Sequence, residues 1–233
     1  MTLSLGTMRS SLVRRLERVV RRIPYARDAL DVVAPTRSVA TLTEENTLAA
    51  YDRVYSSDRL VREYVNPERV AFYEELAALF APLAPRSVID VGCGTGHLLR
   101  LTIDRLAAVP ERVVGVDHSE AGIQRARELF PAARWVVADL HTFQVDERFD
   151  LVICTEVLEH LQHPGRAVEL LLSLCAHGGR VAITVPDGAE DSWEGHVNFW
   201  DEAAFHRFLE PFGLSAVERV EDGRALLAWL SPG

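Results

Sequence analysis

Short apolar runs alternate with amphipathic stretches from about residue 87 onward. The runs are SVIDV at 87–91, RVVGVD at 112–117, ARWVVAD at 133–139, FDLVICT at 149–155 and GRVAITV at 179–185. They are continuously apolar rather than alternating, which is typical of strands buried on both faces of a parallel sheet. Helical patterns lie between them. The sequence therefore predicts an α/β, Rossmann-like doubly wound sheet with right-handed crossovers and helices on both faces.

Helices are expected between these runs and on either side of them. Their predicted ranges are 43–65, 70–80, 97–106, 119–130 and 202–211, with further helical material from 156 to about 176. Thr41 or Thr43 is the expected N-cap of the first helix, and Ser119 can cap the fourth. Near the C-terminus, two strand candidates at 214–220 and 224–230 are three residues apart, which predicts an antiparallel hairpin at the sheet edge.

The N-terminal part has a different pattern. Residues 10–22 read SSLVRRLERVVRR, with the apolar residues on one helical face and arginines elsewhere. This basic amphipathic helix packs on its own domain or on a partner subunit in the favoured interpretation; a membrane surface or an anionic substrate is the alternative. We expect an N-terminal helical extension or lid at 1–70 and the main domain at 71–233. A homodimer through the N-terminal helices stays open.

Composition narrows the class of protein. The chain has 233 residues, of which 48% are hydrophobic, enough for one core with an extension. Its net charge of -9 disfavours a nucleic-acid partner. We expect no membrane span, no signal peptide and no disulfide framework from the three cysteines, and therefore a cytoplasmic protein. The basic residues are all arginine, which excludes lysine chemistry and is compatible with a GC-rich bacterial source.

A glycine-rich loop follows the first strand. The segment VIDVGCGTG at 88–96 places Gly92, Gly94 and Gly96 between a strand and a helix, where the backbone can turn sharply and approach a ligand. Dinucleotide-binding proteins use a related loop, so the loop alone is a weak signal. Here the spacing is G-x-G-x-G, and Asp90 lies inside the strand just ahead of it.

Two more carboxylates end the next two strands. Asp117 closes the second strand, where a carboxylate can accept both hydroxyls of a ribose. Asp139 closes the third, where it can accept from an adenine amine while the Leu140 N–H serves a ring nitrogen. Any one of these aspartates alone would be read as a turn or cap residue. Three of them beside one glycine loop indicate a ligand that contains a nucleoside.

The motifs VIDVGCGTG, VVGVDHSE, VVADL and FDLVICTEVLEHL, in this order, resemble those of class I S-adenosylmethionine-dependent methyltransferases. Small-molecule O-methyltransferases of the ubiquinone-biosynthesis type are similar over roughly residues 75–230. The resemblance implies a seven-stranded sheet, mostly parallel with an antiparallel last strand, and S-adenosyl-L-methionine as cofactor. The cofactor-binding residues that it implies are Asp90, Gly92, Cys93, Gly94, Gly96, Asp117, His118, Asp139, Leu140, Thr155 and Tyr55.

The resemblance also suggests individual roles. The glycines would line the methionine moiety, His118 would lie against the adenine and Thr155 would face the methionine tail. Tyr51 and Tyr55 resemble aromatic residues that close over the cofactor, with ordinary helix packing as the alternative. The thiols of Cys93 and Cys154 are expected to be small core fillers, because no basic neighbour in the sequence activates them.

Histidines are the candidate catalytic residues. Methyl transfer to a hydroxyl needs a base near neutral pH, and His160, His163 and His196 follow strands whose ends face the cleft. The expected acceptor is a small molecule with a hydroxyl, such as a sugar, a polyketide or another natural-product intermediate. Three bulky aromatics in DSWEGHVNFW at 191–200 indicate an acceptor pocket, or packing under the C-terminal hairpin. These aromatics are Trp193, Phe199 and Trp200.

A divalent metal is considered but not favoured. Glu156, Glu159 and His160 would share one helical face, and His196 would add a fourth ligand. Small-RNA 2′-O-methyltransferases show an E-x-x-E-H motif with a later histidine, but ubiquinone-type enzymes share a similar string. Metal-assisted 2′-O-methylation and N-methylation are the alternatives within methyl transfer. An NAD(P)-dependent oxidoreductase and a non-catalytic, cofactor-binding scaffold are the other classes.

Overall fold

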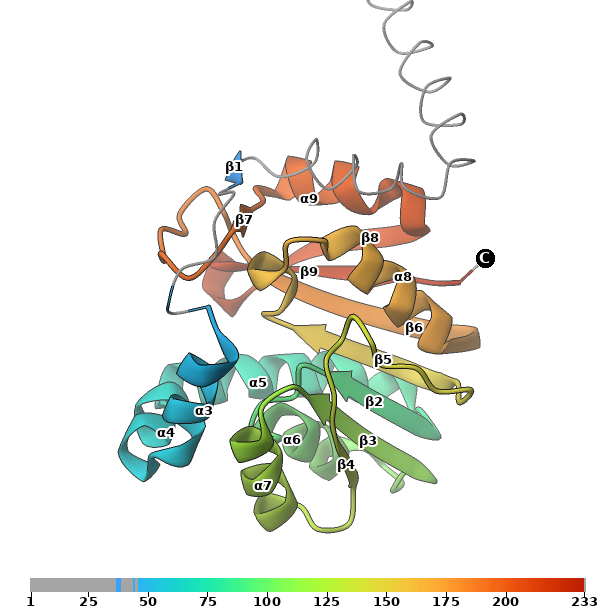
Figure 1. Ribbon diagram of the computed structural model, residues 1–233. Coiled ribbons are helices and arrows are strands. Elements are labelled where there is room, and N and C mark those ends of the chain that lie inside the picture. Colours follow the sequence, from blue (N-terminus) through green and yellow to red (C-terminus); the bar gives the residue numbers. More distant parts are fainter. Residues whose placement is uncertain (1–36, 39–43, 45, 233) are drawn as a thin grey trace, which may run out of the picture.

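The protein is described by a computed structural model that covers residues 37–38, 44 and 46–232 (Figure 1). The basic helix expected at 10–22 therefore lies outside the described residues, as do Thr41 and Thr43. The predicted boundary at residue 70 stays a prediction. No helix within the described residues is both long enough and apolar enough to cross a membrane.

A seven-stranded sheet forms the centre of the molecule. Its strands are β2 (Ser87–Val91), β3 (Arg112–Asp117), β4 (Arg134–Val137), β5 (Phe149–Thr155), β6 (Cys175–Pro186), β8 (Leu214–Val220) and β9 (Ala225–Leu230). Their order is β4-β3-β2-β5-β6-β9-β8. The first five pair in parallel, whereas β9 is antiparallel to both β6 and β8. This confirms the predicted topology, including the C-terminal hairpin.

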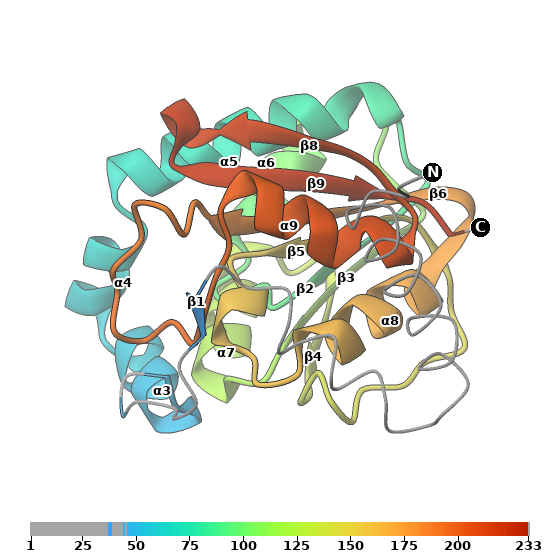
Figure 2. The same ribbon diagram turned by 90° about the horizontal axis from the view of Figure 1, so that it is seen from above.

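Helices cover both faces of the sheet. They are α5 (Pro67–Phe80), α6 (His97–Arg105), α7 (Glu120–Leu129), α8 (Pro164–Leu174) and α9 (Glu202–Leu209). Figure 2 shows α5 and α6 on one side of the strands and α8 and α9 on the other. Short 3-10 turns are η1 (Ala81–Leu83), η2 (Leu158–His160), η3 (Glu210–Phe212) and η4 (Glu221–Gly223).

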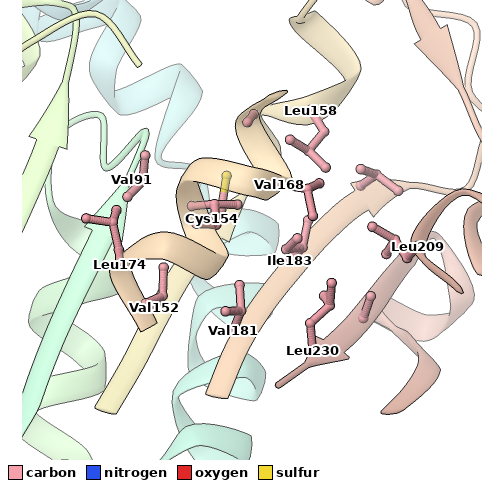
Figure 3. Close-up of a cluster of buried hydrophobic side chains, with 14 of the residues drawn as sticks. Val91, Val152, Cys154, Leu158, Val168, Leu174, Val181, Ile183, Leu209 and Leu230 are labelled. Carbon is pink, nitrogen blue, oxygen red and sulfur yellow. The ribbon is translucent and has the colours of Figure 1, made fainter. Parts of the chain in front are cut away.

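The two faces of the central strand β5 enter two different hydrophobic clusters. Val152 and Cys154 pack with α8 and α9 on one side, as Figure 3 shows for part of that cluster. Leu151 and Ile153 pack with α5, α6 and α7 on the other side. Both faces of β5 are covered, so the strand must be apolar at consecutive positions, which explains its uninterrupted sequence pattern.

The helix expected at 43–65 is two helices. The first is α3 (Leu48–Ser56), and Thr47 caps it by accepting from the Ala50 N–H at 3.2 Å. The second is α4 (Asp58–Tyr64), capped by Ser57. The predicted start of this helix and its predicted continuity to residue 65 were therefore wrong. The side-chain hydroxyls of Thr47 and Ser57 each accept a backbone N–H group, so a new helix begins after each of these residues.

The α3–α4 pair rests on α7 at one end of the sheet (Figure 1). The Ser119 hydroxyl donates to Asp52 on α3 at 2.5 Å. Arg125 on α7 donates to the Tyr55 carbonyl and forms an ion pair of 2.7 Å with Asp58. These contacts hold the α3–α4 pair, called the lid below, against the main domain.

Other differences follow from local backbone chemistry. The segment after β5 is not continuous helix: Glu156 has a φ of +56°, η2 follows, and α8 begins at Pro164, where a proline fits the first helical position. The strand β4 ends at Val137, so Asp139 lies in the following loop. A small second sheet joins β1 (Arg37–Ser38) to β7 (Asn198–Phe199), and two-residue strands carry too little pattern to predict.

Candidate active site

A cavity of about 1320 Å³ opens at the carboxyl ends of the parallel strands. It is larger than the roughly 300–1,000 Å³ of an ordinary ligand pocket, so two small molecules fit in it side by side. One part is lined by the glycine loop and the ends of β3, β4 and β5. The other part is lined by α3, η2 and the 187–196 segment.

The glycine loop takes backbone conformations that favour glycine. Gly92 and Gly94 have φ values of +81° and +50°. A Cβ on Gly92 would lie 2.3 Å from Val157, and one on Gly94 would lie 3.0 Å from the Tyr55 hydroxyl. The Tyr55 side chain, which is 4% exposed, thus covers this loop from the lid. Side chains at either glycine would push the lid or η2 away from the cavity.

Asp117 joins the two loops on either side of it. One carboxylate oxygen accepts the Gly94 N–H at 2.8 Å, and the other accepts the Ser119 N–H at 2.8 Å. Burial raises the pKa of Asp117, while these backbone donors oppose that rise. Each oxygen keeps a lone pair for a further donor, such as a sugar hydroxyl.

Asp90 is the most deeply buried of the three carboxylates predicted to bind the cofactor. It is 2% exposed, and burial followed by the nearby charge of Asp117 raises its pKa to about 8. A carboxyl group in this state favours a cationic neighbour, because a positive charge would allow it to ionise.

The structure brings nearly all the predicted cofactor residues to the cavity. Gly96 is the exception: it is buried against the Trp135 ring and does not line the cavity. The Thr155 hydroxyl lines the cavity, is buried and has no hydrogen-bond partner among the described residues. Asp139 is exposed and already accepts the His141 N–H at 2.8 Å. The remaining lining residues of the predicted set are Tyr55, Asp90, Gly92, Cys93, Gly94, Asp117, His118 and Leu140.

A basic group in the cavity was missed by sequence reasoning. Arg69 lies on the first turn of α5, with its guanidinium 4.7 Å from the centre of the Tyr64 ring. It interacts electrostatically with Glu156, which accepts the Thr184 hydroxyl at 3.0 Å. Burial raises the pKa of Glu156 to about 7, and Arg69 opposes this rise. The sequence did contain a sign of this position: Asn66 and Pro67 are typical of a helix start, and a helix that begins there has Arg69 in its first turn.

Two of the three candidate histidines meet in the other part of the cavity. The Nδ1 atom of His196 lies 2.6 Å from an Asp191 carboxylate oxygen. The His160 and His196 ring centres are 4.7 Å apart, and the Tyr51 hydroxyl lies 3.2 Å from Nδ1 of His160. His163 also lines the cavity but lies outside this cluster.

Glu159 lies between these histidines. One of its oxygens is 3.7 Å from Nε2 of His160 and 4.0 Å from Nε2 of His196. The side chain is 1% exposed, and neither oxygen has a hydrogen-bond partner among the described residues. Burial raises the pKa of Glu159 well above its usual range and lowers that of His160 to about 3.

The predicted four-residue metal set is only partly assembled. Ligand atoms of Glu159, His160 and His196 lie within 4.8 Å of one another, whereas Glu156 is not in this group. The expectation that Glu156, Glu159 and His160 share a helical face was wrong, because the chain takes a left-handed conformation at Glu156 before the short η2 turn. The histidine from the later loop completes the group instead.

Only one of the three predicted pocket aromatics lines the cavity. Trp193 does so and is 43% exposed. Phe199 and Trp200 are buried in the core, where Trp200 stacks on Phe208 of α9 at 5.2 Å. The Asn198 side chain donates to the Leu158 carbonyl at 3.1 Å, which fixes the loop beside η2.

The chain matches one family and several curated proteins. Residues 61–219 match the family described as methyltransferase domain. Trans-aconitate 2-methyltransferase of Variovorax paradoxus (strain S110) is 34% identical over 133 residues, 57% of this chain and 50% of that protein. The ubiquinone biosynthesis O-methyltransferase of Stutzerimonas stutzeri (strain A1501) is 33% identical over 123 residues, 50% of each chain. The chain spans about half the length of these relatives.

Solved structures share the fold. DhpI in complex with SAH has a TM-score of 0.64 at 22% identity, covering 81% of this chain and 96% of that one. N-methyltransferase NodS from Bradyrhizobium japonicum WM9, in complex with S-adenosyl-L-homocysteine, has a TM-score of 0.62 at 24% identity, covering 79% and 97%. These likenesses confirm the predicted fold class.

Replacing Asp90 by asparagine should change how stability depends on pH. An unfolded aspartate has a pKa of about 3.9, whereas Asp90 in the folded chain has a pKa of about 8. The folded state therefore retains a proton that the unfolded state loses, and Asp90 lowers the free energy of unfolding as pH rises between these values. We expect Asp90→Asn to gain stability relative to wild type across this range, by about 5 kcal/mol at pH 8, in urea titrations.

The control is Asp104→Asn, whose carboxylate is exposed and paired with Arg100. Its difference from wild type should be nearly constant with pH. A constant difference for Asp90→Asn as well would contradict the raised pKa of Asp90.

Proposed function

This chain belongs to the methyltransferase domain family, and on that premise we propose that it transfers the methyl group of S-adenosylmethionine to a hydroxyl oxygen of a small molecule. The resemblance to class I S-adenosylmethionine-dependent methyltransferases is confirmed by the family match and by the shared fold. One observation carries the proposal. A single cavity joins a carboxylate-lined part suited to a nucleoside with a part that holds a histidine–aspartate pair.

The part next to the glycine loop suits the cofactor. Asp117 is placed for the ribose hydroxyls, and Asp139 with the Leu140 N–H for the adenine edge. Asp90 and the unpartnered Thr155 hydroxyl suit the methionine ammonium group. This pairing would remove the energetic cost of a buried carboxylate without a cation. The bound cofactor supplies a methyl group that its sulfonium already activates.

Arg69 completes this part of the cavity. It lines the cavity and interacts electrostatically with Glu156. We assign it to the methionine carboxylate, because a guanidinium pairs with a carboxylate through parallel hydrogen bonds. Tyr64 below its guanidinium restricts the side chain and supports this role.

The histidine–aspartate pair suits the acceptor. Asp191 accepts a hydrogen bond from Nδ1 of His196, which orients the ring and leaves Nε2 to accept a proton. As the acceptor oxygen bonded to the methyl carbon, the bond from that carbon to the cofactor sulfur would break, S-adenosylhomocysteine would leave as a neutral thioether, and the hydroxyl proton would move to Nε2 of His196. His160 has the Tyr51 hydroxyl as its partner instead of a carboxylate at bonding distance, so it is the weaker candidate base.

Three further points stay proposals. The acceptor is a small molecule such as a sugar, a polyketide or another natural-product intermediate. The protein acts in the cytoplasm. A homodimer through the N-terminal helices concerns residues outside the described part of the chain.

The cofactor assignment is tested by isothermal calorimetry with S-adenosylhomocysteine. We expect wild-type protein to bind and Asp117→Asn to bind about 100-fold more weakly, because an amide cannot accept from both loops and also from the ribose. The control Asp146→Asn changes an exposed carboxylate outside the cavity and should bind like wild type. Equal affinity for all three proteins would contradict the assignment of Asp117, and an absence of binding would contradict the function.

The base assignment is tested by turnover. His196→Ala should lower kcat by about 10²–10⁴-fold, the usual contribution of a general base, and leave the affinity for S-adenosylhomocysteine unchanged. Asp191→Asn should give a smaller loss, since it removes only the group that orients the ring. His163→Ala is the comparison, because His163 lines the cavity outside the cluster. A larger loss of kcat in His163→Ala than in His196→Ala would move the role of base to His163.

A metal-assisted methyltransferase is the second candidate. The converging ligand atoms of Glu159, His160 and His196, together with the unpartnered Glu159 carboxylate, favour it. One carboxylate and two imidazoles suit zinc, cobalt or manganese and leave coordination positions open. Such an ion would lower the pKa of an acceptor hydroxyl.

This candidate is tested with cobalt(II), which absorbs visibly when histidines bind it. Metal-free wild-type protein should bind one equivalent of Co²⁺, and Glu159→Gln should bind none above background. Glu156→Gln should bind like wild type, because Glu156 lies outside the ligand group. Equal binding by wild type and Glu159→Gln would remove the metal candidate and leave the base mechanism unaffected.

A further inference from the structure

The part of the cavity around the histidines is called the acceptor part below. It is lined by Tyr51, by 159–163 and by Glu190, Asp191, Trp193 and His196. Three carboxylates line it, those of Glu159, Glu190 and Asp191, together with three imidazoles, whereas the two arginines of the cavity lining, Arg69 and Arg224, are not part of these segments. Asp191 bonds to His196, Glu190 is exposed, and Glu159 is buried without a hydrogen-bond partner among the described residues. The acceptor part thus presents negative charge and unused acceptor atoms to a ligand.

The arginines that line the cavity elsewhere already face carboxylates. Arg69, which interacts with Glu156, is taken up by the methionine carboxylate in the proposed function, and Arg224 lies 3.6 Å from both Glu68 and Glu221. Recognition of a polycarboxylate requires guanidinium groups or other cations that are not already matched. Within the described residues, this cavity is therefore poorly suited to a tricarboxylate, although several relatives are named trans-aconitate 2-methyltransferase.

Aromatic rings also line the acceptor part. The Trp193 side chain is 43% exposed at the cavity, and the Trp193 and Tyr51 rings both lie edge-on to the His160 ring. Indole and phenol rings attract cations over their faces. Carboxylates and aromatic rings that share one pocket are a combination that selects positively charged ligands.

From this we propose that the methyl acceptor is a hydroxylated amine, bound as a cation in the acceptor part, rather than a carboxylate-bearing molecule. The proposal rests on the proposed function and deepens it. The ammonium group lies near Glu190 and Asp191, and its proton is retained. The hydroxyl oxygen receives the methyl group, and the hydroxyl proton passes to Nε2 of His196. If Glu159 is protonated, the carboxylates of Glu190 and Asp191 still give this part of the cavity a negative charge.

Three probes that share a 4-hydroxyphenyl ring and differ in the charged or polar group at the end of the side chain test the proposal. Tyramine is a cation, tyrosol is neutral and 4-hydroxyphenylacetate is an anion, and each carries one phenolic hydroxyl. Their binding is measured by saturation-transfer NMR on the full chain, treated with chelator and saturated with S-adenosylhomocysteine. We expect tyramine to bind about tenfold more tightly than 4-hydroxyphenylacetate, with tyrosol between them, and added salt to reduce the difference.

A matched pair of variants locates the effect. Glu190→Gln should reduce the preference for tyramine about two- to threefold, as expected for one exposed charge. Glu194→Gln lies in the same segment but outside the cavity lining, and it should retain the wild-type preference. Equal binding of cation and anion, tighter binding of the anion, or no binding of tyramine would overturn the proposal. Loss of S-adenosylhomocysteine binding in calorimetry would instead point to failure of the proposed function.

Discussion

One buried carboxylate organises the site. Asp117 ends β3 and accepts backbone N–H groups from the glycine loop on one side and from the start of α7 on the other. Charge-assisted hydrogen bonds of this kind are stronger and shorter than neutral ones, so the spacing of the two loops is set by a single side chain. The cavity wall at Gly94 keeps its distance from the start of α7 because of it. The same α7 supports the lid through Arg125.

The buried strands could be predicted from the sequence because their apolar pattern repeats. The five parallel strands are covered on both faces, so each needs several consecutive apolar residues, and the loops that follow them meet at one edge of the sheet. That relation places Asp90, Asp117 and Thr155 around a common cavity before any coordinate is known. The antiparallel hairpin was readable for a similar reason, since three residues leave room only for a turn.

Individual backbone angles and contacts between distant residues could not be predicted from the sequence. Glu156 adopts a left-handed conformation that a helical pattern does not reveal, and this moves it from the histidines toward Arg69. Trp200 belongs to the core instead of the cavity because α9 offers Phe208 to stack on, a contact set by tertiary packing. The Asp191–His196 pair depends on how one irregular segment closes over η2, and Asn198 holds that segment through backbone carbonyls far away in sequence.

Ser119, two residues after Asp117, forms a second hydrogen bond that reaches the lid. Ser119 supports Asp117 through its backbone N–H and holds Asp52 of the lid through its hydroxyl. Movement of the lid away from α7 breaks this bond together with those of Arg125. A ligand that left past Tyr55 would have to break these contacts, so its residence time would depend on the motion of two short helices.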